Sequence, residues 1–503
     1  MHKIFVILFL LILTSSSLLA QDSTTLALAI KGLDLGSNLQ YKEAYEVFQK
    51  LIELEPDNPR GYFLRSAIYF WMYSEDINNE EVGNKFRDLS YEAVEVGEAK
   101  LAENKNDIDA RFFLGGAYGS LGRYYALQRS YLNAYWYGKK GKDYLEEVVE
   151  MDSTYYDAYL GLGIYHYLAD VLPRFVKILS VILGVQGDRE QGLREIQLAA
   201  DKGLYSQTEA MFVLAGIYAF REDRYEEAIE IFNKLLEKYP ENPGALLALG
   251  RCYEYMRQCD LAMDAYKRIL ANRDSQSRLP RGTLYYRLGD NYFKKNDFES
   301  AKNNFLLAIA SDTSEVGKKR WTTSRAQFRA AQCYEILGEI DSAKYQLSLI
   351  SEEDGGRSYQ NAQERLENRM KEIDISMIKA GNFEECNDID QALTSYINIT
   401  EQYADDPDPY IREQFIEVEY RIAELYVEKK DYRKAISYFE KIIETTKELD
   451  ERILYRSYYN LGNCYKWIEN YNSARKAYDA AENTDDDRLL ARIEEARKDL
   501  PGE

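Results

Sequence analysis

The sequence predicts an all-α chain built from repeated helical hairpins, on three observations. Between Glu209 and Pro243, apolar residues recur at the spacing of one helix face on either side of a charged turn. The same pattern returns further along, with 34 residues separating Ala228 from Ala262. Only 9 prolines occur in 503 residues, which suits a chain that is helical throughout.

The hairpin from Glu209 to Pro243 defines the elements of the repeat. One face of its first helix carries small and large apolar residues, namely Phe212, Ala215, Gly216 and Ala219. A charged turn follows, and the second helix ends at Pro240, which cannot continue a helix. We expect Gly216 and Ala228 to let the two helices approach closely, while Phe232 fills the space between repeats.

Three further copies follow the same pattern. They contain Leu246, Leu249, Gly250, Tyr253, Ala262, Tyr266; Tyr285, Leu288, Gly289, Tyr292, Phe298, Ala301, Phe305; and Tyr458, Leu461, Gly462, Tyr465, Tyr471, Ala474, Tyr478. This pattern resembles the tetratricopeptide-repeat (TPR) family, whose unit is a helix-turn-helix of about 34 residues. The resemblance implies a right-handed α-solenoid of about ten hairpins.

The N-terminus reads as a secretory signal peptide over residues 1–20. His2 and Lys3 precede a short apolar run, and the segment closes at Ala20, so we expect cleavage before Gln21. An uncleaved membrane anchor is the alternative, although the run is short for a span of about 20 residues. The mature chain is therefore expected to be exported, as a periplasmic or outer-membrane-associated protein.

The rest of the chain divides by how regular the repeats are. We predict a degenerate array with a hydrophobic insertion at 170–190, a regular central array, a C-terminal array and a capping tail, over residues 21–208, 209–350, 351–484 and 485–503. Within the first array, Gly115, Gly116 and Gly119 are expected to face a close helix crossing. Within the C-terminal array, a single long helix is expected from Tyr359 to Lys379.

The insertion is mostly apolar over residues 171–185, but Pro173, Arg174 and Lys177 interrupt it. It is either a helix or hairpin packed on the array or a surface that makes peripheral contact with a membrane or partner. The segment is similar to the tetratricopeptide repeat protein 39 family in Leu172-Pro173, Lys177, Leu179, Gly187-Asp188-Arg189 and Gly192-Leu193. That resemblance implies an adaptor, sometimes near membranes, and supplies no catalytic residues.

The five cysteines are not expected to form a disulfide framework, because their number is odd. Cys252, Cys333 and Cys464 share one place in the first helix and are predicted to be small buried core residues. Cys252 and Cys259 would bridge only if a helix end met a turn. Cys386 is the fifth cysteine of the chain.

No motif for catalysis, cofactor or metal binding stands out, so we predict none of the three. His166 is the one histidine after the signal segment and is expected to lie in the core or the groove. The acidic runs at Asp405, Asp406 and Asp408 and at 485–487 lack the spacing of calcium loops. A formal charge of −21 argues against nucleic acid as a partner.

The remaining candidate is the concave surface, which TPR proteins line with the first helix of each repeat. The family's groove positions fall here on Tyr286, Arg287, Asp290, Phe328, Arg329, Gln332, Tyr420, Arg421, Glu424, Tyr459, Asn460 and Asn463. The arginines either pair with a carboxylate on a ligand or pair with neighbouring Glu and Asp of the chain.

We therefore expect a non-enzymatic scaffold that binds protein or peptide segments in its groove. One alternative is a module that binds glycans or small molecules through the tyrosine-rich groove, since the chain has 44 tyrosines. A less favoured alternative is a hydrolase that uses acidic residues of the groove.

Overall fold

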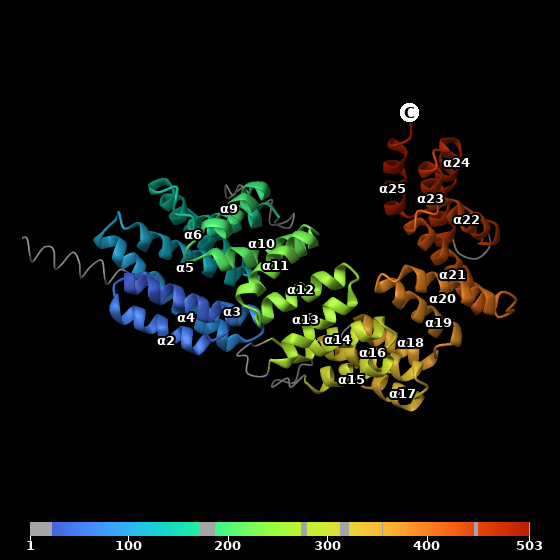
Figure 1. Ribbon diagram of the computed structural model, residues 1–503, viewed down its shortest axis with the longest axis horizontal. Coiled ribbons are helices and arrows are strands. Elements are labelled where there is room, and N and C mark those ends of the chain that lie inside the picture. The colour runs from blue at the N-terminus through green and yellow to red at the C-terminus, as the bar shows by residue number, and fades with distance from the viewer. Residues whose placement is uncertain are drawn as a thin grey trace, which may run out of the picture. The chain divides into compact units, whose positions relative to one another are not determined.

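The computed structural model describes residues 23–171, 187–272, 279–311, 321–354, 356–446 and 451–501. Throughout these residues the regular structure is helical, with no strand (Figure 1). Backbone contacts divide the chain into two compact units, Met1–Met256 with Leu261–Arg281 and Arg257–Asp260 with Gly282–Glu503. The predicted signal peptide and residues 172–186, most of the predicted insertion, lie outside the described residues.

The first unit is a run of helical hairpins. A helix over residues 23–37 is followed by α2 (Tyr41–Leu54), α3 (Pro59–Glu75), α4 (Glu80–Glu103), α5 (Ile108–Leu127), α6 (Tyr131–Met151), α7 (Ala158–Asp170), α9 (Arg189–Lys202), α10 (Gln207–Arg221), α11 (Tyr225–Lys238), α12 (Pro243–Tyr255) and α13 (Cys259–Ala271). The first two residues of α13 belong to the second unit.

The second unit continues the same arrangement. It contains α14 (Arg281–Lys294), α15 (Phe298–Ala310), α16 (Trp321–Ile336), α17 (Ile340–Ser348), a short 3-10 helix (Glu352–Asp354), α18 (Gly356–Glu367), α19 (Glu372–Glu385), α20 (Ile389–Tyr403), α21 (Pro409–Glu428), α22 (Tyr432–Thr446), α23 (Glu451–Trp467), α24 (Tyr471–Ala481) and α25 (Asp487–Lys498). The predicted all-α solenoid of hairpins is confirmed.

One residue in the left-handed conformation marks the turn inside most hairpins. Its φ is positive, between 52° and 83°, at Leu39, Arg129, Asp223, Arg257, Asn296, Gly338, Asn387, Lys430 and Glu469. Only one of these residues is a glycine, although side chains disfavour this conformation by about 1–2 kcal/mol. The packing of the two helices therefore overrides a local preference at the same place in successive repeats.

Asparagine and aspartate begin many of the helices by capping them. The side chain of Asn242 accepts a hydrogen bond from the backbone N–H of Ala245 at 2.9 Å, and Asp297 accepts one from Ser300 at 3.0 Å. Such caps satisfy N–H groups that have no partner within the helix.

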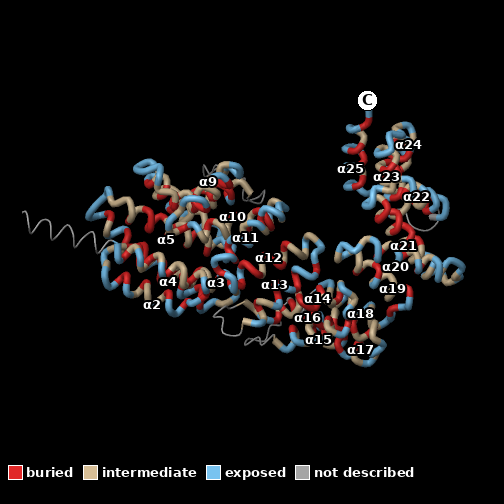
Figure 2. The backbone as a smooth tube through the Cα atoms, viewed as in Figure 1, coloured by how far each residue is buried: buried red, intermediate tan, exposed pale blue. Residues whose placement is uncertain are grey.

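Several hairpins close where a glycine of the first helix meets a ring of the second helix, sixteen residues further on. A Cβ added to Gly250 would lie 2.6 Å from the ring of Tyr266, and one added to Gly289 would lie 2.9 Å from Phe305. Figure 2 shows buried residues along the facing sides of the paired helices. The expectation was wrong for Gly216, where an added Cβ would meet nothing within 4 Å.

Glycines also permit close crossings in the first unit. The prediction for α5 holds at Gly115 and Gly116, where an added Cβ would lie 3.0 Å from Leu145 and 3.1 Å from the Phe63 ring, but an added Cβ at Gly119 would meet nothing within 4 Å. A Cβ added to Gly122 would lie 2.8 Å from the backbone nitrogen of Gly138, and one added to Gly141 would lie 2.6 Å from that of Gly119. Here α5 and α6 approach with only backbone between them, and the same holds for α7 and α9 at Gly163 and Gly192.

The predicted single helix from Tyr359 to Lys379 was wrong, because the structure divides it into α18 and α19. The backbone N–H of Met370 donates to the carboxylate of Glu335 on α16 at 2.5 Å, and that of Lys371 donates to Asp374 at 2.8 Å. These bonds satisfy N–H groups at the break, so a contact from a distant helix stabilises the interruption.

The sequence analysis expected no disulfide framework and considered only a bridge between Cys252 and Cys259, whereas the structure joins Cys259 to Cys386 across 127 residues of sequence. Both cysteines lie at hairpin turns and belong to the second unit. Cys252, Cys333 and Cys464 are free and buried, as predicted for core residues.

A matched pair of glycine variants tests the contact that closes the hairpin. Gly250→Ala should lower the stability by about 1–2 kcal/mol, because the new methyl group overlaps the Tyr266 ring and overpacking outweighs the gain in helix propensity. Gly216→Ala, at the same place one repeat earlier, should raise it by up to about 1 kcal/mol. Thermal unfolding of both variants measures this, and equal shifts would contradict it.

Candidate functional site

A polar cavity of about 380 Å³ lies in the second unit. Its lining comes from α14, α16, α19, α20 and α21, and four of these are the first helices of their hairpins. The predicted rule that first helices supply the groove therefore holds for this cavity.

Three of the residues predicted for the groove line this cavity, namely Arg329, Gln332 and Arg421. Asp290 and Glu424, which were also predicted for the groove, do not line the cavity but pair with its two arginines. Asp290 accepts a hydrogen bond from Arg329 at 2.8 Å, and Glu424 accepts one from Arg421 at 3.2 Å.

Both arginines make ion pairs within the chain, and those of Arg421 are the more exposed to solvent. Arg329 also lies over the ring of Phe293, with its Cζ 4.6 Å from the ring centre. Arg421 bonds Glu417 at 3.1 Å as well as Glu424, and its side chain is 42% exposed. The prediction that the arginines pair with neighbouring acidic residues therefore describes both of them in this structure.

The other predicted groove residues are not among those lining this cavity: Tyr286, Arg287, Phe328, Tyr420, Tyr459, Asn460 and Asn463. Tyr420 and Tyr459 are buried. Asn460 donates to the hydroxyl of Tyr420 at 2.9 Å, and Asn463 accepts from that of Tyr478 at 2.8 Å. These four contribute to packing between and within hairpins.

Sequence reasoning missed the residues that α19 supplies to the cavity, among them Asn382 and Glu384. The amide of Asn382 donates to the carbonyl of Phe293 at 2.7 Å and so fixes α19 beside α14. Burial raises the pKa of Glu384, and Arg421 only partly opposes it. The sequence did contain a signal that α19 is the first helix of a repeat. Ala380 stands sixteen residues before Tyr396, which is the spacing between Gly250 and Tyr266.

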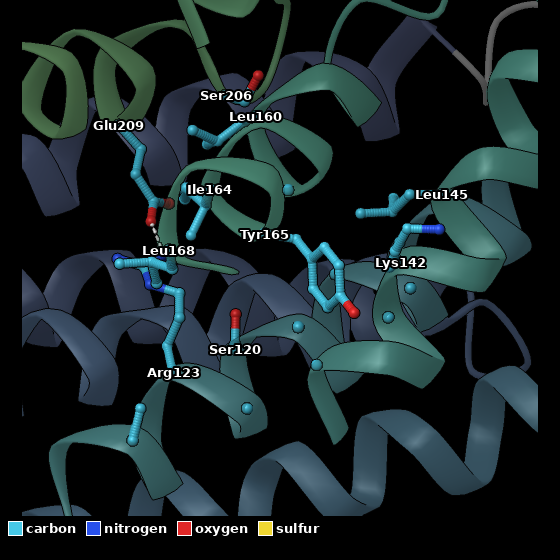
Figure 3. A pocket seen from close by; sticks show the side chains of 18 of the residues that line it. Ser120, Arg123, Lys142, Leu145, Leu160, Ile164, Tyr165, Leu168, Ser206 and Glu209 are labelled. Carbon is cyan, nitrogen blue, oxygen red and sulfur yellow. Dashed lines mark hydrogen bonds and ion pairs between the residues drawn. The ribbon is translucent and has the colours of Figure 1, made fainter. Parts of the chain in front are cut away.

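A second cavity, of about 460 Å³, lies in the first unit between α3, α5, α6, α7 and α10 (Figure 3). Its lining is mostly aliphatic, aromatic and glycine residues. The close-up shows Ile164 and Tyr165 of α7 between the pair of Arg123 and Glu209 on one side and Leu145 on the other, while Leu168 overlaps the pair in this view. The sequence analysis did not predict this cavity, although the glycines of α5 were a signal for it.

The candidates for acid–base chemistry have structural partners. His166 is buried, as predicted, and its Nδ1 lies 2.7 Å from a carboxylate oxygen of Glu195. Asp408 and Asp486, from the two acidic runs, cap α21 and α25. Among the described residues, no group of three His, Cys, Asp or Glu is placed to hold a metal ion.

Tyrosines stack on one another rather than presenting open rings at two places in the first unit. The rings of Tyr118 and Tyr144 are stacked with centres 5.9 Å apart, and those of Tyr125 and Tyr137 with centres 5.2 Å apart. Within the described ranges, no helix has both the length and the apolar character to cross a membrane.

Comparison with known families supports the class that this fold defines, a protein of stacked helical hairpins. Tetratricopeptide-repeat models match residues 182–243, 219–279, 282–314, 417–448 and 455–487. The chain therefore contains tetratricopeptide repeats over these residues. The similarity to the tetratricopeptide repeat protein 39 family stays a prediction.

One curated relative is a TPR repeat-containing protein of Methanocaldococcus jannaschii, which is 26% identical over 294 residues. The match covers 52% of this chain and 48% of the relative, so the chain spans about half the length of that protein.

Similar solved structures include PilF of Pseudomonas aeruginosa (17% identity, 51% of this chain and 99% of that one, TM-score 0.35). PilW, described as a type IV pilus biogenesis factor, is 15% identical, over 50% and 98%, with a TM-score of 0.35. Yeast Tom70 is 15% identical, over 94% and 100%, with a TM-score of 0.29. At these scores no conclusion about this chain is drawn from them.

The raised pKa of Glu384 predicts how stability changes with pH. Because the folded state holds this proton more tightly than the unfolded state, ionisation of Glu384 destabilises the fold as the pH rises through its pKa. Glu384→Gln should therefore raise the melting temperature at neutral pH by a few degrees. The gain should vanish at acidic pH, where Glu384 is protonated in the parent protein.

Glu385→Gln is the control, because it removes the same charge from the exposed neighbour in the same cavity. Thermal unfolding at neutral and acidic pH compares the two variants. A gain for Glu384→Gln that persists at acidic pH would contradict the assignment.

Proposed function

We propose that this protein is an exported, non-enzymatic scaffold that binds an extended protein segment along the polar cavity of its second unit. The observation that supports this most is the presence of Arg329 and Arg421, from two different first helices, in the lining of one cavity. Arginine is typical of the residues that contribute most to protein interfaces.

The ligand we propose carries a carboxylate, from Asp, Glu or a chain end. The pairs that Arg421 makes with Glu417 and Glu424 are partly exposed, and such ion pairs contribute only about 0–1 kcal/mol. A ligand carboxylate that excludes water can therefore replace Glu424 at modest cost and form a bidentate pair with Arg421. Met377, Ile378 and Tyr396 in the same lining supply apolar contact.

The lining favours binding over catalysis. The described residues that line this cavity include Glu384, Glu385 and Glu417 but no histidine, serine, cysteine or lysine. The usual pairing for acyl transfer, a Ser or Cys nucleophile activated by an adjacent base, is therefore not present in the described lining.

Two features support export. The first 20 residues have the pattern of a signal peptide. The disulfide between Cys259 and Cys386 is of the kind that persists in oxidising compartments outside the cytoplasm.

Removal of the groove arginines should abolish capture of the partner. Pull-down from a periplasmic extract with the mature chain should recover partners that the triple variant Arg287→Ala, Arg329→Ala, Arg421→Ala recovers at less than about a tenth of the yield.

The matched control is Arg357→Ala, Arg412→Ala, Arg433→Ala, which removes three exposed arginines of the same unit that do not line the cavity. It loses the same charge and should recover the partners at the parental yield. If the groove variant and the control recover them equally, the proposed groove is wrong.

Export predicts two properties that one mass-spectrometric measurement checks. The mature protein should begin at Gln21, and its native, non-reduced form should contain Cys259 linked to Cys386. The other three cysteines should resist alkylation until unfolding, because burial raises the pKa of Cys252 to about 11 and those of Cys333 and Cys464 to about 12. A retained Met1, or free thiols at Cys259 and Cys386, would contradict export with cleavage.

A further inference from the structure

The cavity of the first unit has the size and lining of a small-molecule site. Its volume of about 460 Å³ falls within the usual range of roughly 300–1,000 Å³ for ligand pockets. Leu132 and Leu168 both line it and are exposed, at 69% and 41%, so apolar surface reaches solvent at its mouth. This cavity is separate from the polar cavity and belongs to the other unit.

Four of the five described charged residues in its lining, all but Arg221, have hydrogen-bond or ion-pair partners within the chain. Arg123 donates to Glu209 at 2.5 Å, the pair drawn in Figure 3. Lys142 lies 2.6 Å from Glu146 on its own helix. Asp157 accepts three bonds, from the hydroxyl and backbone N–H of Ser206 and from the backbone N–H of Tyr205. A ligand therefore finds mainly hydrocarbon surface here.

This lining distinguishes between two kinds of apolar ligand. Every residue of a peptide brings one backbone N–H and one C=O, and each such group costs free energy when it is buried without a partner. With four of its five charged side chains already paired, the cavity offers few partners for the backbone groups of a peptide. A hydrocarbon chain brings no polar groups, and its burial is favourable by about 0.8 kcal/mol for each CH₂.

Glycine creates part of this space. A Cβ added to Gly119, which lines the cavity, would meet no atom within 4 Å, so the helix wall is open at that point. The backbone of Gly119 meanwhile lies against α6 at Gly141, which fixes the wall in place.

We propose that this cavity binds an unbranched hydrocarbon chain, carried by a free fatty acid or by a phospholipid. The chain lies against Ile164 and Leu168 of α7 and the glycine-lined wall of α5, and its polar end remains at the mouth beside Leu132.

A fluorescence titration of the full mature chain tests this. The probe is cis-parinaric acid, a fatty acid whose emission rises when it leaves water, with palmitate as the competitor. We expect saturable binding that palmitate displaces. Gly119→Leu, which fills the cavity, should weaken binding by about tenfold or more, since it occupies the volume of several CH₂ groups.

Gly216→Leu is the matched control. It makes the same change at another helical glycine whose added Cβ would meet nothing, and Gly216 does not line the cavity. It should bind the probe within about twofold of the parent. Circular dichroism should show both variants to be folded, because each replaces glycine in a helix by a better helix former.

Two competitors distinguish the possible sources of the hydrocarbon chain. Displacement by palmitate alone assigns a free fatty acid, and displacement by phosphatidylglycerol vesicles as well assigns the chain of a lipid. The proposal is wrong if palmitate does not displace the probe, if Gly119→Leu binds as tightly as Gly216→Leu, or if a water-soluble apolar peptide competes as well as palmitate. None of these results depends on the arginines of the polar cavity.

Discussion

The regular hairpins of the array depend on one contact, between a small residue of the first helix and the large side chain that follows it by sixteen residues. At Gly250, Gly289 and Gly462, an added Cβ would lie within 3 Å of the facing ring. The distance between the two helices of these hairpins is therefore set by the absence of a side chain on one and the bulk of a ring on the other. Because each hairpin contacts mainly its neighbours, repetition of this contact builds the fold.

The turns show how strongly this packing acts on the backbone. Asp223, Arg257 and Glu469 occupy the left-handed region although glycine would do so without strain. The conformation recurs because it is the short connection that returns the chain at the angle the interlocked helices require. Local preference therefore yields to tertiary contact at the same point of successive repeats.

One scaffold presents two different surfaces because the residues that line a concavity are free of this packing constraint. In the first unit, α5 and α7 contribute glycine and aliphatic residues, and the result is an apolar cavity. In the second unit, α16 and α21 contribute Arg329 and Arg421, and the result is a polar one. The repeat pattern is compatible with an apolar or a polar cavity. The pattern therefore defines the fold, while a few lining residues determine the chemistry of each cavity.

The sequence by itself determined whatever depends on one helix or one hairpin. Periodicity predicted the helices, the shared context of Cys252, Cys333 and Cys464 predicted their burial, and the repeat pattern placed Arg329 and Arg421 on first helices. Gly216 is an exception. It occupies the same place in the repeat pattern, but a Cβ added there would meet no atom within 4 Å.

Only the tertiary structure decided the features that join distant parts of the sequence. Glu335 stabilises the break between α18 and α19, Cys259 meets Cys386 across 127 residues, and several hairpins together enclose the apolar cavity. The physical reason is that side-chain periodicity determines which face of a helix is buried. It does not determine which residue of another hairpin that face will meet.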